Sequence, residues 1–224
     1  MIAIQTTGLT KVIDGRMVLR NVSLKISAGE CVAITGANGA GKTTLLRSLC
    51  GATRPTSGSI YWYGQTSRNV AEVRRLIGYV AHEPQLYPYL TVRENLVFAA
   101  RMHGLSRPLR RADEQLQAIG LQCASDQLAS RISRGMRQRL AIARAVIHDP
   151  RIVLLDEPFT GLDRQGCAWL DGLLRQLRQP GRAVCFVTHQ LPLQLHLADR
   201  VWYLHGGEIQ ETVRGMNHLA QQVA

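Results

Sequence analysis

The sequence lacks the features of a membrane-spanning, secreted or disulfide-bonded protein. No segment approaches the roughly 18 consecutive apolar residues that a transmembrane helix needs. The first residues, MIAIQTTGLTKV, show neither the basic start nor the long apolar run of a signal peptide. The five cysteines are scattered and form no Cys-x-x-Cys pair, which argues against a disulfide framework or a zinc site. We therefore expect a soluble protein in a reducing compartment.

Lysine is also scarce, and arginine supplies most of the positive charge. Lys11, Lys25 and Lys42 are the lysines among 27 basic residues, and the formal net charge is +11. Such an excess indicates an anionic partner, such as nucleic acid, phospholipid head groups or a polyphosphate. Charge alone does not choose among these partners, and part of it can reflect an arginine-favouring composition.

No internal repeat, low-complexity segment or linker divides the chain. Its 224 residues, 46% of them hydrophobic, suffice for one large domain or one domain with an inserted subdomain. Apolar runs and alternating patterns predict strands at 18–26, 30–35, 59–63, 151–155 and 182–188. Segments 200–204 and 208–210, on either side of Gly206-Gly207, predict a late hairpin.

Between these strands the pattern becomes helical. Thr91 and Glu94 form a capping-box pattern, and Gly104 ends the helix that it predicts. Ser106 is then expected to cap a second helix with Pro108 in its first turn. We expect an α/β core with a helical insertion at residues 91–148.

A glycine-rich loop follows the strand at 30–35 and precedes a helix. It matches G-x-x-x-x-G-K-[ST], and its residues are Gly36, Ala37, Asn38, Gly39, Ala40, Gly41, Lys42, Thr43 and Thr44. The glycines let backbone N–H groups approach phosphate oxygens, and a helix N-terminus adds partial positive charge. Lys42 can then contact the β- and γ-phosphates and Thr43 can ligate Mg²⁺, while Thr44 is a phosphate-side donor or a helix filler. The loop predicts binding of a nucleoside triphosphate.

Two carboxylates and a histidine follow later strands. Asp156 and Glu157 end an apolar strand, where an α/β sheet builds its site. Asp156 can hold Mg²⁺, and Glu157 can orient and deprotonate the water that attacks the γ-phosphate. Another apolar strand ends in Thr188-His189-Gln190, so we expect His189 to contact the γ-phosphate rather than to be merely structural.

Residues 132–139, Ile-Ser-Arg-Gly-Met-Arg-Gln-Arg, precede the helical run LAIARAVI. With the phosphate loop, Asp156-Glu157, the Thr-Gly-Leu-Asp loop at 160–163 and His189, this segment resembles the ATP-binding subunits of ABC transporters. Their signature, Leu-Ser-Gly-Gly-Gln, stands here as Ile-Ser-Arg-Gly-Met. The resemblance implies a P-loop NTPase fold of α/β class, an ABC ATPase cassette with an antiparallel β subdomain and an inserted α-helical subdomain. The core would comprise residues 1–90 and 149–224, and the helical signature subdomain residues 91–148.

The resemblance also implies a homodimer in which two ATP molecules are sandwiched between head-to-tail subunits. The signature residues that would complete the other subunit's site are Ser133, Arg134, Gly135 and Met136, with Asp163 bridging between the sites. Arg134 departs from the family pattern, and its guanidinium could reach phosphate or point to solvent. Val12 and Ile13 stand where the family has an aromatic residue against adenine, so we expect weaker or less selective recognition of the base.

Family membership implies that separate integral membrane permease subunits form the translocation path. This chain would then be a membrane-peripheral ATPase at the cytoplasmic face of the bacterial inner membrane, with the helical region docking the permease. A group of arginines in that region could face phospholipid or acidic loops, or could form a solvated helix face: Arg93, Arg101, Arg107, Arg110 and Arg111.

The details of the motifs are most similar to the haem-exporter ATPases of cytochrome c maturation. Other bacterial exporters with separate membrane subunits share similar features. Non-transport ABC ATPases that act on nucleic acid carry a coiled-coil insertion or tandem cassettes, which this chain lacks, so no nucleic-acid partner is expected.

His82 contributes to this resemblance, because it stands where most ABC ATPases have a glutamine that ligates Mg²⁺ and senses the membrane subunit. Imidazole binds Mg²⁺ poorly, so we expect His82 to contact the metal-bound or attacking water and to couple hydrolysis to the permease. An ordinary loop histidine or a haem ligand are the alternatives. The predicted catalytic residues are therefore Glu157, His189 and His82.

Overall fold

The structure is a computed structural model that describes residues 1–66, 70–189 and 195–212. Gln190, which was grouped with His189 above, lies outside the described residues. Within the described parts of the chain, no helix has both the length and the apolar character required to cross a bilayer. The five cysteines are free, as expected.

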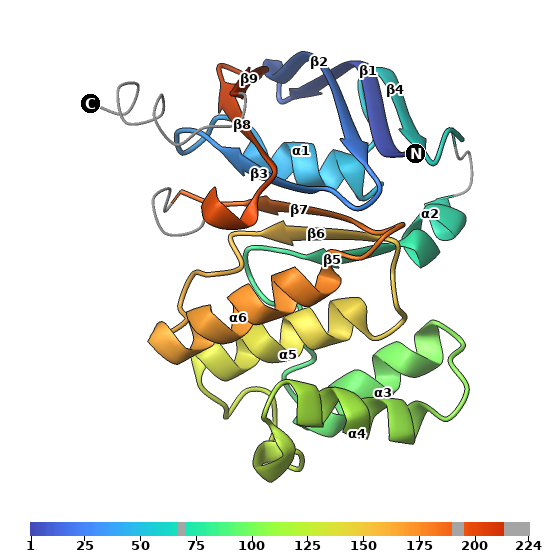
Figure 1. Cartoon of the computed structure of the whole chain (residues 1–224), viewed down its shortest axis with the longest axis vertical. Coiled ribbons are helices and arrows are strands. Elements are labelled where there is room, and N and C mark those ends of the chain that lie inside the picture. The colour runs from blue at the N-terminus through green and yellow to red at the C-terminus, as the bar shows by residue number, and fades with distance from the viewer. Residues whose placement is uncertain (67–69, 190–194, 213–224) are drawn as a thin grey trace.

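Two β-sheets form the framework (Figure 1). A three-stranded antiparallel sheet has the order β2-β1-β4, formed by β1 (Ile2–Ile13), β2 (Arg16–Ser27) and β4 (Ser57–Trp62). A six-stranded sheet has the order β5-β6-β7-β3-β8-β9. Its strands are β3 (Cys31–Thr35), β5 (Ile77–Val80), β6 (Ile152–Asp156), β7 (Ala183–Val187), β8 (Arg200–His205) and β9 (Glu208–Thr212). Its first five strands are parallel, and β9 pairs antiparallel with β8.

In the described residues, six α-helices surround these sheets: α1 (Lys42–Leu49), α2 (Val70–Leu76), α3 (Val92–Met102), α4 (Pro108–Ala118), α5 (Arg134–Val146) and α6 (Arg164–Leu177). Single 3-10 turns occur at Gln122–Ala124 and Leu195–Leu197. Figure 1 shows α1 between the two sheets, with α5 and α6 against the opposite face of the six-stranded sheet and α3 and α4 beyond α5. Helices on both faces explain why β3, β6 and β7 are buried throughout and read as continuous apolar runs.

The buried residues form three clusters. One joins α1, the antiparallel sheet and one face of the six-stranded sheet, and a second joins the other face to α5 and α6. The third lies between residues 92 and 147, where α3 and α4 pack against the outer side of α5. Because Ala141 and Ile142 belong to the second cluster and Leu140 and Ala143 to the third, α5 packs on both sides at once.

The sequence patterns located most of these elements. The capping box of Thr91 and Glu94 is present, and Gly104, with a positive φ of 68°, follows the end of α3. The late hairpin forms β8 and β9. The expectation that Ser106 caps α4 was wrong. Arg107, in the left-handed region at φ 56°, is the N-cap, since Pro108 already occupies the first helical position.

Strand β1 was not predicted, because its sequence IAIQTTGLTKVI does not alternate cleanly between apolar and polar residues. Register shifts interrupt its pairing with both β2 and β4. Its hydrogen bonds to two neighbouring strands therefore form it where the local pattern is weak.

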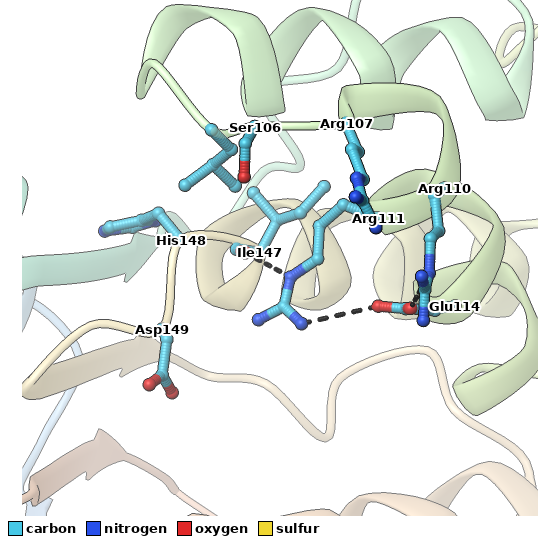
Figure 2. A pocket seen from close by; sticks show the side chains of 9 residues that line it. Ser106, Arg107, Arg110, Arg111, Glu114, Ile147, His148 and Asp149 are labelled. Carbon is cyan, nitrogen blue, oxygen red and sulfur yellow. Dashed lines mark hydrogen bonds and ion pairs between the residues drawn. The ribbon is translucent and has the colours of Figure 1, made fainter.

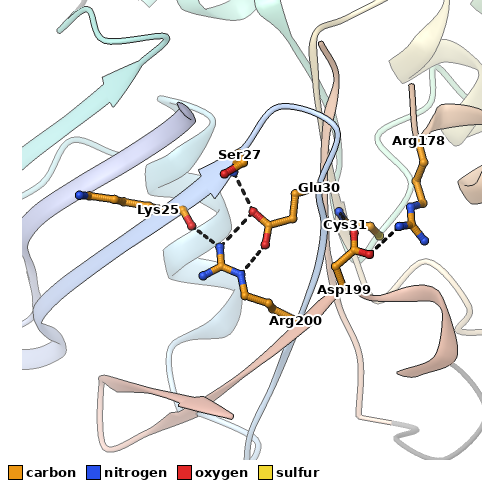
Figure 3. A network of polar contacts seen from close by, with 7 residues as sticks. All are labelled: Lys25, Ser27, Glu30, Cys31, Arg178, Asp199 and Arg200. Carbon is orange, nitrogen blue, oxygen red and sulfur yellow. Dashed lines mark hydrogen bonds and ion pairs between the residues drawn. The ribbon is translucent and has the colours of Figure 1, made fainter. Parts of the chain in front are cut away.

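A network of charged residues closes the end of the six-stranded sheet where β3 and β8 begin (Figure 3). The Glu30 carboxylate accepts hydrogen bonds from Arg200 and from the Ser27 amide. Asp199 accepts from Arg178 at 2.6 Å and from the Cys31 amide at 2.9 Å. The parallel strands that start here end at the opposite edge of the sheet, where the phosphate loop at residues 36–44 follows β3. The network therefore stabilises the sheet at the end that is remote from this loop.

Candidate functional site

The residues with predicted chemistry gather where the parallel strands end, which we call the carboxyl edge. The phosphate loop (residues 36–44) follows β3, and His82 follows β5. Asp156 ends β6 with Glu157 directly after it, and His189 follows β7. Because β5, β6, β7 and β3 are neighbours in that order, four connections that are distant in sequence meet at this edge.

The phosphate loop packs too closely against neighbouring backbone for any side chain at two of its glycines. Gly36 has φ 145°, and a Cβ there would collide with the carbonyl oxygen of Leu204. Gly41 has φ 104°, and its Cβ would lie 2.8 Å from the carbonyl oxygen of Val18. Both positions therefore require glycine. Ala37, Asn38 and Gly39 at the outer side of the loop remain exposed, so their backbone is accessible to a ligand.

Lys42 lies beneath the loop at the start of α1 and is 6% exposed. Its Nζ donates to the carbonyl oxygens of Gly36 at 2.7 Å and Ala37 at 2.9 Å. Burial lowers the pKa of Lys42, while the carboxylates of Glu157 and Asp156 act in the opposite direction. A positive charge, a helix N-terminus and turned glycine backbone thus converge, which is the arrangement that binds phosphate.

Asp156 ends β6 as a buried carboxylate. It is 1% exposed, and neither carboxylate oxygen has a hydrogen-bond partner among the described residues. Burial raises the pKa of its carboxyl, against the opposing effects of Thr43, His82 and Lys42. Buried charges normally pair or coordinate a metal. The orphaned oxygens of Asp156, with the exposed Thr43 side chain beside them, fit a hard cation such as Mg²⁺.

Replacing Asp156 by Asn should stabilise the nucleotide-free chain. Burial raises the pKa of Asp156 in the folded chain above its value in the unfolded chain. Above the folded-state pKa the buried carboxyl is ionised, which lowers the free energy of unfolding, and this free energy increases as pH falls through that pKa. Asn removes this cost, and a gain of ~1 kcal/mol corresponds to about 2–4 °C in Tm for a chain of this size. Calorimetry at neutral pH with a chelator measures it, with exposed Asp126→Asn as the control. An unchanged or lower Tm would contradict the prediction.

Glu157 is the point at which both histidines meet. Its Oε2 lies 3.0 Å from Nδ1 of His189 and 3.5 Å from Nδ1 of His82. The same oxygen accepts a hydrogen bond from the Thr160 hydroxyl at 3.3 Å. The Glu157 side chain is 15% exposed, against 50% for His82 and 46% for His189. A carboxylate held on an inner wall, with two imidazoles on its solvent side, can accept a proton from bound water.

The sequence patterns did not predict that Thr160 would contact Glu157. Its position in the 160–163 loop, just after the two carboxylates, was the available signal. His82 and His189, by contrast, were both named from sequence, and the structure brings them to one carboxylate oxygen.

The signature residues contact a different part of the chain. Ser133 is the N-cap of α5, and its hydroxyl accepts from the Met136 amide at 3.2 Å. The Arg134 side chain lies against Gly161, leaving no room for a Cβ there, and Gly135 lies near the Gly161 carbonyl. Across the described residues, no hydrogen bond or ion pair joins residues 133–136 to the phosphate loop.

Asp163 and Ile13 were also predicted to contribute. Asp163 is the N-cap of α6, and its Oδ1 accepts from the Gly166 amide at 2.7 Å, so one carboxylate oxygen is used within the chain. Ile13 ends β1 and is 41% exposed. The hairpin that carries it reaches the phosphate loop through Val18, which contacts Gly41.

Most of the arginine group in the helical region is paired within the chain. Arg93 forms an ion pair with Asp113, and Arg110 and Arg111 both pair with Glu114. Figure 2 shows Arg107, Arg110 and Arg111 lining a hollow of about 330 Å³ beside the start of α4. This hollow is formed by α4 and the 147–149 segment rather than by the carboxyl edge. The paired arginines are better described as a solvated, ion-paired face than as free positive charge.

Comparison with known proteins agrees with this geometry. A family model described as "ABC transporter" matches residues 19–160. The chain is 35% identical over 212 residues to the bacitracin transport ATP-binding protein of Bacillus licheniformis, covering 94% of this chain and 69% of the relative. It is 38% identical over 195 residues to the ABC transporter ATP-binding protein NatA of Bacillus subtilis, covering 85% and 79%.

Solved structures also match the fold of this chain. A dimeric ATP-binding cassette in a post-hydrolysis state, bound to ADP and phosphate, matches with a TM-score of 0.87 and 30% identity over 95% of this chain and 100% of that one. A second dimeric structure of the same cassette, described as a bacterial ABC transporter cassette, matches with a TM-score of 0.86 at the same identity and coverage.

The curated relatives differ in length and in transport role. The chain spans between 56% and 79% of the length of the relatives compared. Their names include bacitracin transport as well as sulfate/thiosulfate import in Mesorhizobium japonicum, at 38% identity over 86% of this chain. The family is common to all of these proteins, while the cargo differs. The chain therefore belongs to the ABC transporter family, and it is an ATP-binding cassette of the kind that couples ATP hydrolysis to transport.

Proposed function

We propose that this chain binds and hydrolyses Mg²⁺-ATP in a head-to-tail homodimer and thereby powers separate permease subunits. The observation that carries the proposal is the meeting of Lys42, Asp156, Glu157, His82 and His189 at the carboxyl edge. A buried lysine can bind phosphate, a buried carboxylate with no hydrogen-bond partner among the described residues can bind Mg²⁺, and a second carboxylate beside two imidazoles can accept the proton of the attacking water.

Each residue has a separate task in this proposal. Backbone amides of residues 36–41, together with Lys42 and Thr44, hold the phosphates of the nucleotide. Thr43 and Asp156 hold Mg²⁺, which when bound neutralises phosphate charge. Glu157 accepts a proton from the attacking water. His189 and His82 hold the Glu157 carboxylate and the water in register.

The second subunit contributes the signature residues. Ser133 and the Gly135 backbone, flanked by Arg134 and Met136, would face the γ-phosphate of the other subunit, with Asp163 between the two sites. The dimeric state of one cassette that is 30% identical to this chain, seen in two solved structures, supports such an arrangement. Ile13, exposed at the end of β1, would contact the base by apolar packing without aromatic stacking.

The permease would dock on the helical subdomain, residues 91–148, and on the loop before it. Large apolar side chains are exposed there, including Tyr89 at 86%, Met102 at 70% and Leu109 at 57%. Exposed apolar groups of this size are typical of interaction surfaces. The assembly would place this chain at the cytoplasmic face of the bacterial inner membrane, held there by its partners.

We assign the permease to the haem-exporter type of cytochrome c biogenesis. His82 in place of glutamine, the Ser-Arg-Gly-Met signature and the Asp156–Asp163 segment support this assignment. The relative named as a bacitracin transport ATP-binding protein favours a second candidate, another bacterial exporter for a drug, lipid or polysaccharide.

Isolation of the tagged full chain from native membranes decides between them. Stoichiometric partners of the cytochrome c maturation type would establish the haem exporter, and a different permease would refute it. If the chain instead shifted DNA or RNA in a salt-dependent, ATP-modulated way, the transport proposal would give way to action on nucleic acid.

His82→Ala should uncouple hydrolysis from the permease more than it weakens ATP binding. His82 is half exposed and contacts Glu157 from the loop after β5, so its loss should leave the phosphate loop intact. We expect nearly normal ATP affinity but loss of the stimulation of ATPase activity by permease and cargo. Comparison of the purified chain with the reconstituted complex measures this effect. Unaltered coupled turnover would refute the assigned role of His82.

A further inference from the structure

Gln138 forms a buried bond to the segment that carries Glu157. It lies in the second turn of α5 and is 3% exposed, although glutamine side chains are mostly exposed in proteins. Its Nε2 donates to the carbonyl oxygen of Pro158 at 3.1 Å, between residues 20 apart in sequence. Since Pro158 directly follows Glu157, the helix that begins at the signature is tied to the turn holding the predicted base.

The backbone of Glu157 needs such support. Its φ of 50° places a non-glycine residue in the left-handed region, and a following proline disfavours helical conformations further. Conformations of this kind persist only where surrounding contacts determine them. The Glu157 amide donates to the Val187 carbonyl at 3.2 Å, and the Glu157 carbonyl accepts from the Thr160 amide at 3.1 Å. Gln138 supplies a third contact through its hydrogen bond to the carbonyl oxygen of the next residue, Pro158.

A second contact joins the same two segments. The Arg134 side chain covers Gly161, and a Cβ on Gly135 would lie 3.6 Å from the Gly161 carbonyl oxygen. The first two turns of α5 therefore pack against residues 158–161 at both ends. A shift of the signature end of α5 would move the turn that orients Glu157.

We propose that Gln138 is a positioning residue that orients Glu157 of its own subunit through the Pro158 carbonyl. This inference rests on the proposed function, in which Glu157 accepts the proton of the attacking water. In the proposed dimer, α5 touches one nucleotide through its signature end, while Glu157 of the same subunit serves the other. Binding of ATP against the signature end of α5 would then, through the Gln138–Pro158 bond, change the orientation of Glu157 at the other ATP site.

Gln138→Met in the full chain tests the role. Methionine keeps the length and burial of the side chain but donates no hydrogen bond to Pro158. A small misplacement of a catalytic group can cost about a hundredfold, so we expect kcat to fall roughly 10- to 100-fold. The KM for ATP should stay unchanged, as should ATP-driven dimerisation when the substitution is combined with Glu157→Gln. Gln117→Met, at an exposed position in α4, is the matched control. An unchanged kcat, or loss of dimerisation, would overturn the proposal.

Mixed dimers show on which subunit Gln138 acts. Each mixed dimer contains one Glu157→Gln subunit, so that Glu157 is intact only in the other subunit. The rate of phosphate formation is measured in a single turnover. Gln138→Met should slow the reaction when it lies in the subunit with intact Glu157, and should have no effect in the other subunit. The reverse pattern, or equal losses from both placements, would show that Gln138 acts through the signature or through general stability, and the proposal would fail. A mixed dimer with normal Gln138 in both subunits can prove inactive because one intact Glu157 is not enough for hydrolysis. In that case the kcat and the dimerisation of the Gln138→Met chain decide whether Gln138 positions Glu157.

This outcome is separate from that of the proposed function. If Glu157→Gln leaves hydrolysis unchanged, Glu157 is not the base and the proposed function fails, whatever Gln138 does. If Glu157→Gln stops hydrolysis while Gln138→Met leaves it unchanged, only the positioning role is lost.

Discussion

Glu157→Gln is expected to bind ATP and to form a stable dimer while hydrolysis falls roughly 10²- to 10⁴-fold, the usual contribution of a general base. The amide keeps the shape of the carboxylate, and an amide nitrogen or oxygen can still meet Thr160, His189 and His82. It cannot accept a proton from water near neutral pH. Phosphate release measures the loss, and light scattering with and without ATP measures dimerisation.

The control for this prediction is Asp126→Asn, which removes an exposed carboxylate from the helical region at a similar change in net charge. Retention of normal hydrolysis by Glu157→Gln would exclude Glu157 as the base. A variant that binds ATP but stays monomeric at saturating ATP, even with its membrane partners, would exclude the shared-site mechanism.

Lys42→Ala is expected to lower ATP affinity strongly, because the buried ammonium is the charge that the phosphate loop presents. Hydrogen bonds to charged groups contribute about 1.5–3 kcal/mol, so loss of such a contact corresponds to roughly 10- to 150-fold in Kd. The effect should be larger for ATP than for AMP, because the ammonium lies under the part of the loop that would hold the terminal phosphates. Titration calorimetry with both nucleotides measures the difference.

Lys25→Ala provides the matched control, since it removes an exposed lysine from β2 and lowers the net charge equally. In Lys42→Ala the carbonyl oxygens of Gly36 and Ala37 lose the hydrogen bonds from Lys42. Thermal unfolding shows whether the chain remains folded without these bonds. A folded Lys42→Ala chain with wild-type affinity for ATP would refute the role of this lysine.

The departures from the family signature have a structural explanation in part. Arg134 was expected either to reach phosphate or to point to solvent, and within this chain its side chain, from Cγ to the guanidinium Nε, covers Gly161. Arginine can do so because Gly161 has a positive φ of 79° and no side chain. Arg134 as a whole is exposed at the start of α5, where it follows Ser133 in the sequence. The position of Met136 has a simpler explanation, since it packs on the cluster formed by α3, α4 and α5.

Prediction from sequence succeeded where a local pattern has a local physical cause. The capping box at Thr91 and the Gly206-Gly207 hairpin were found because each depends on residues that are near in sequence. Strand β1 was missed and the cap of α4 was misassigned to Ser106. Strand β1 pairs with β2 across the two-residue turn Asp14-Gly15 and with β4 much further along the chain, and its own apolar pattern is weak. The left-handed backbone of Arg107 begins α4 and leaves no clear pattern in the sequence.

By itself the sequence determined the chemistry of the site: a phosphate loop after one strand, two carboxylates after another, and histidines at 82 and 189. Residue types and spacing suffice for this, because glycine, lysine, carboxylate and imidazole have few substitutes in these tasks. Only the tertiary structure decided that both imidazoles meet one oxygen of Glu157 and that Gln138 donates a hydrogen bond to Pro158, the residue after Glu157. It also decided that Asp156 is buried with no hydrogen-bond partner among the described residues. These contacts arise from the order in which distant strands pair and helices pack, and strand order is not encoded in any short stretch of the chain.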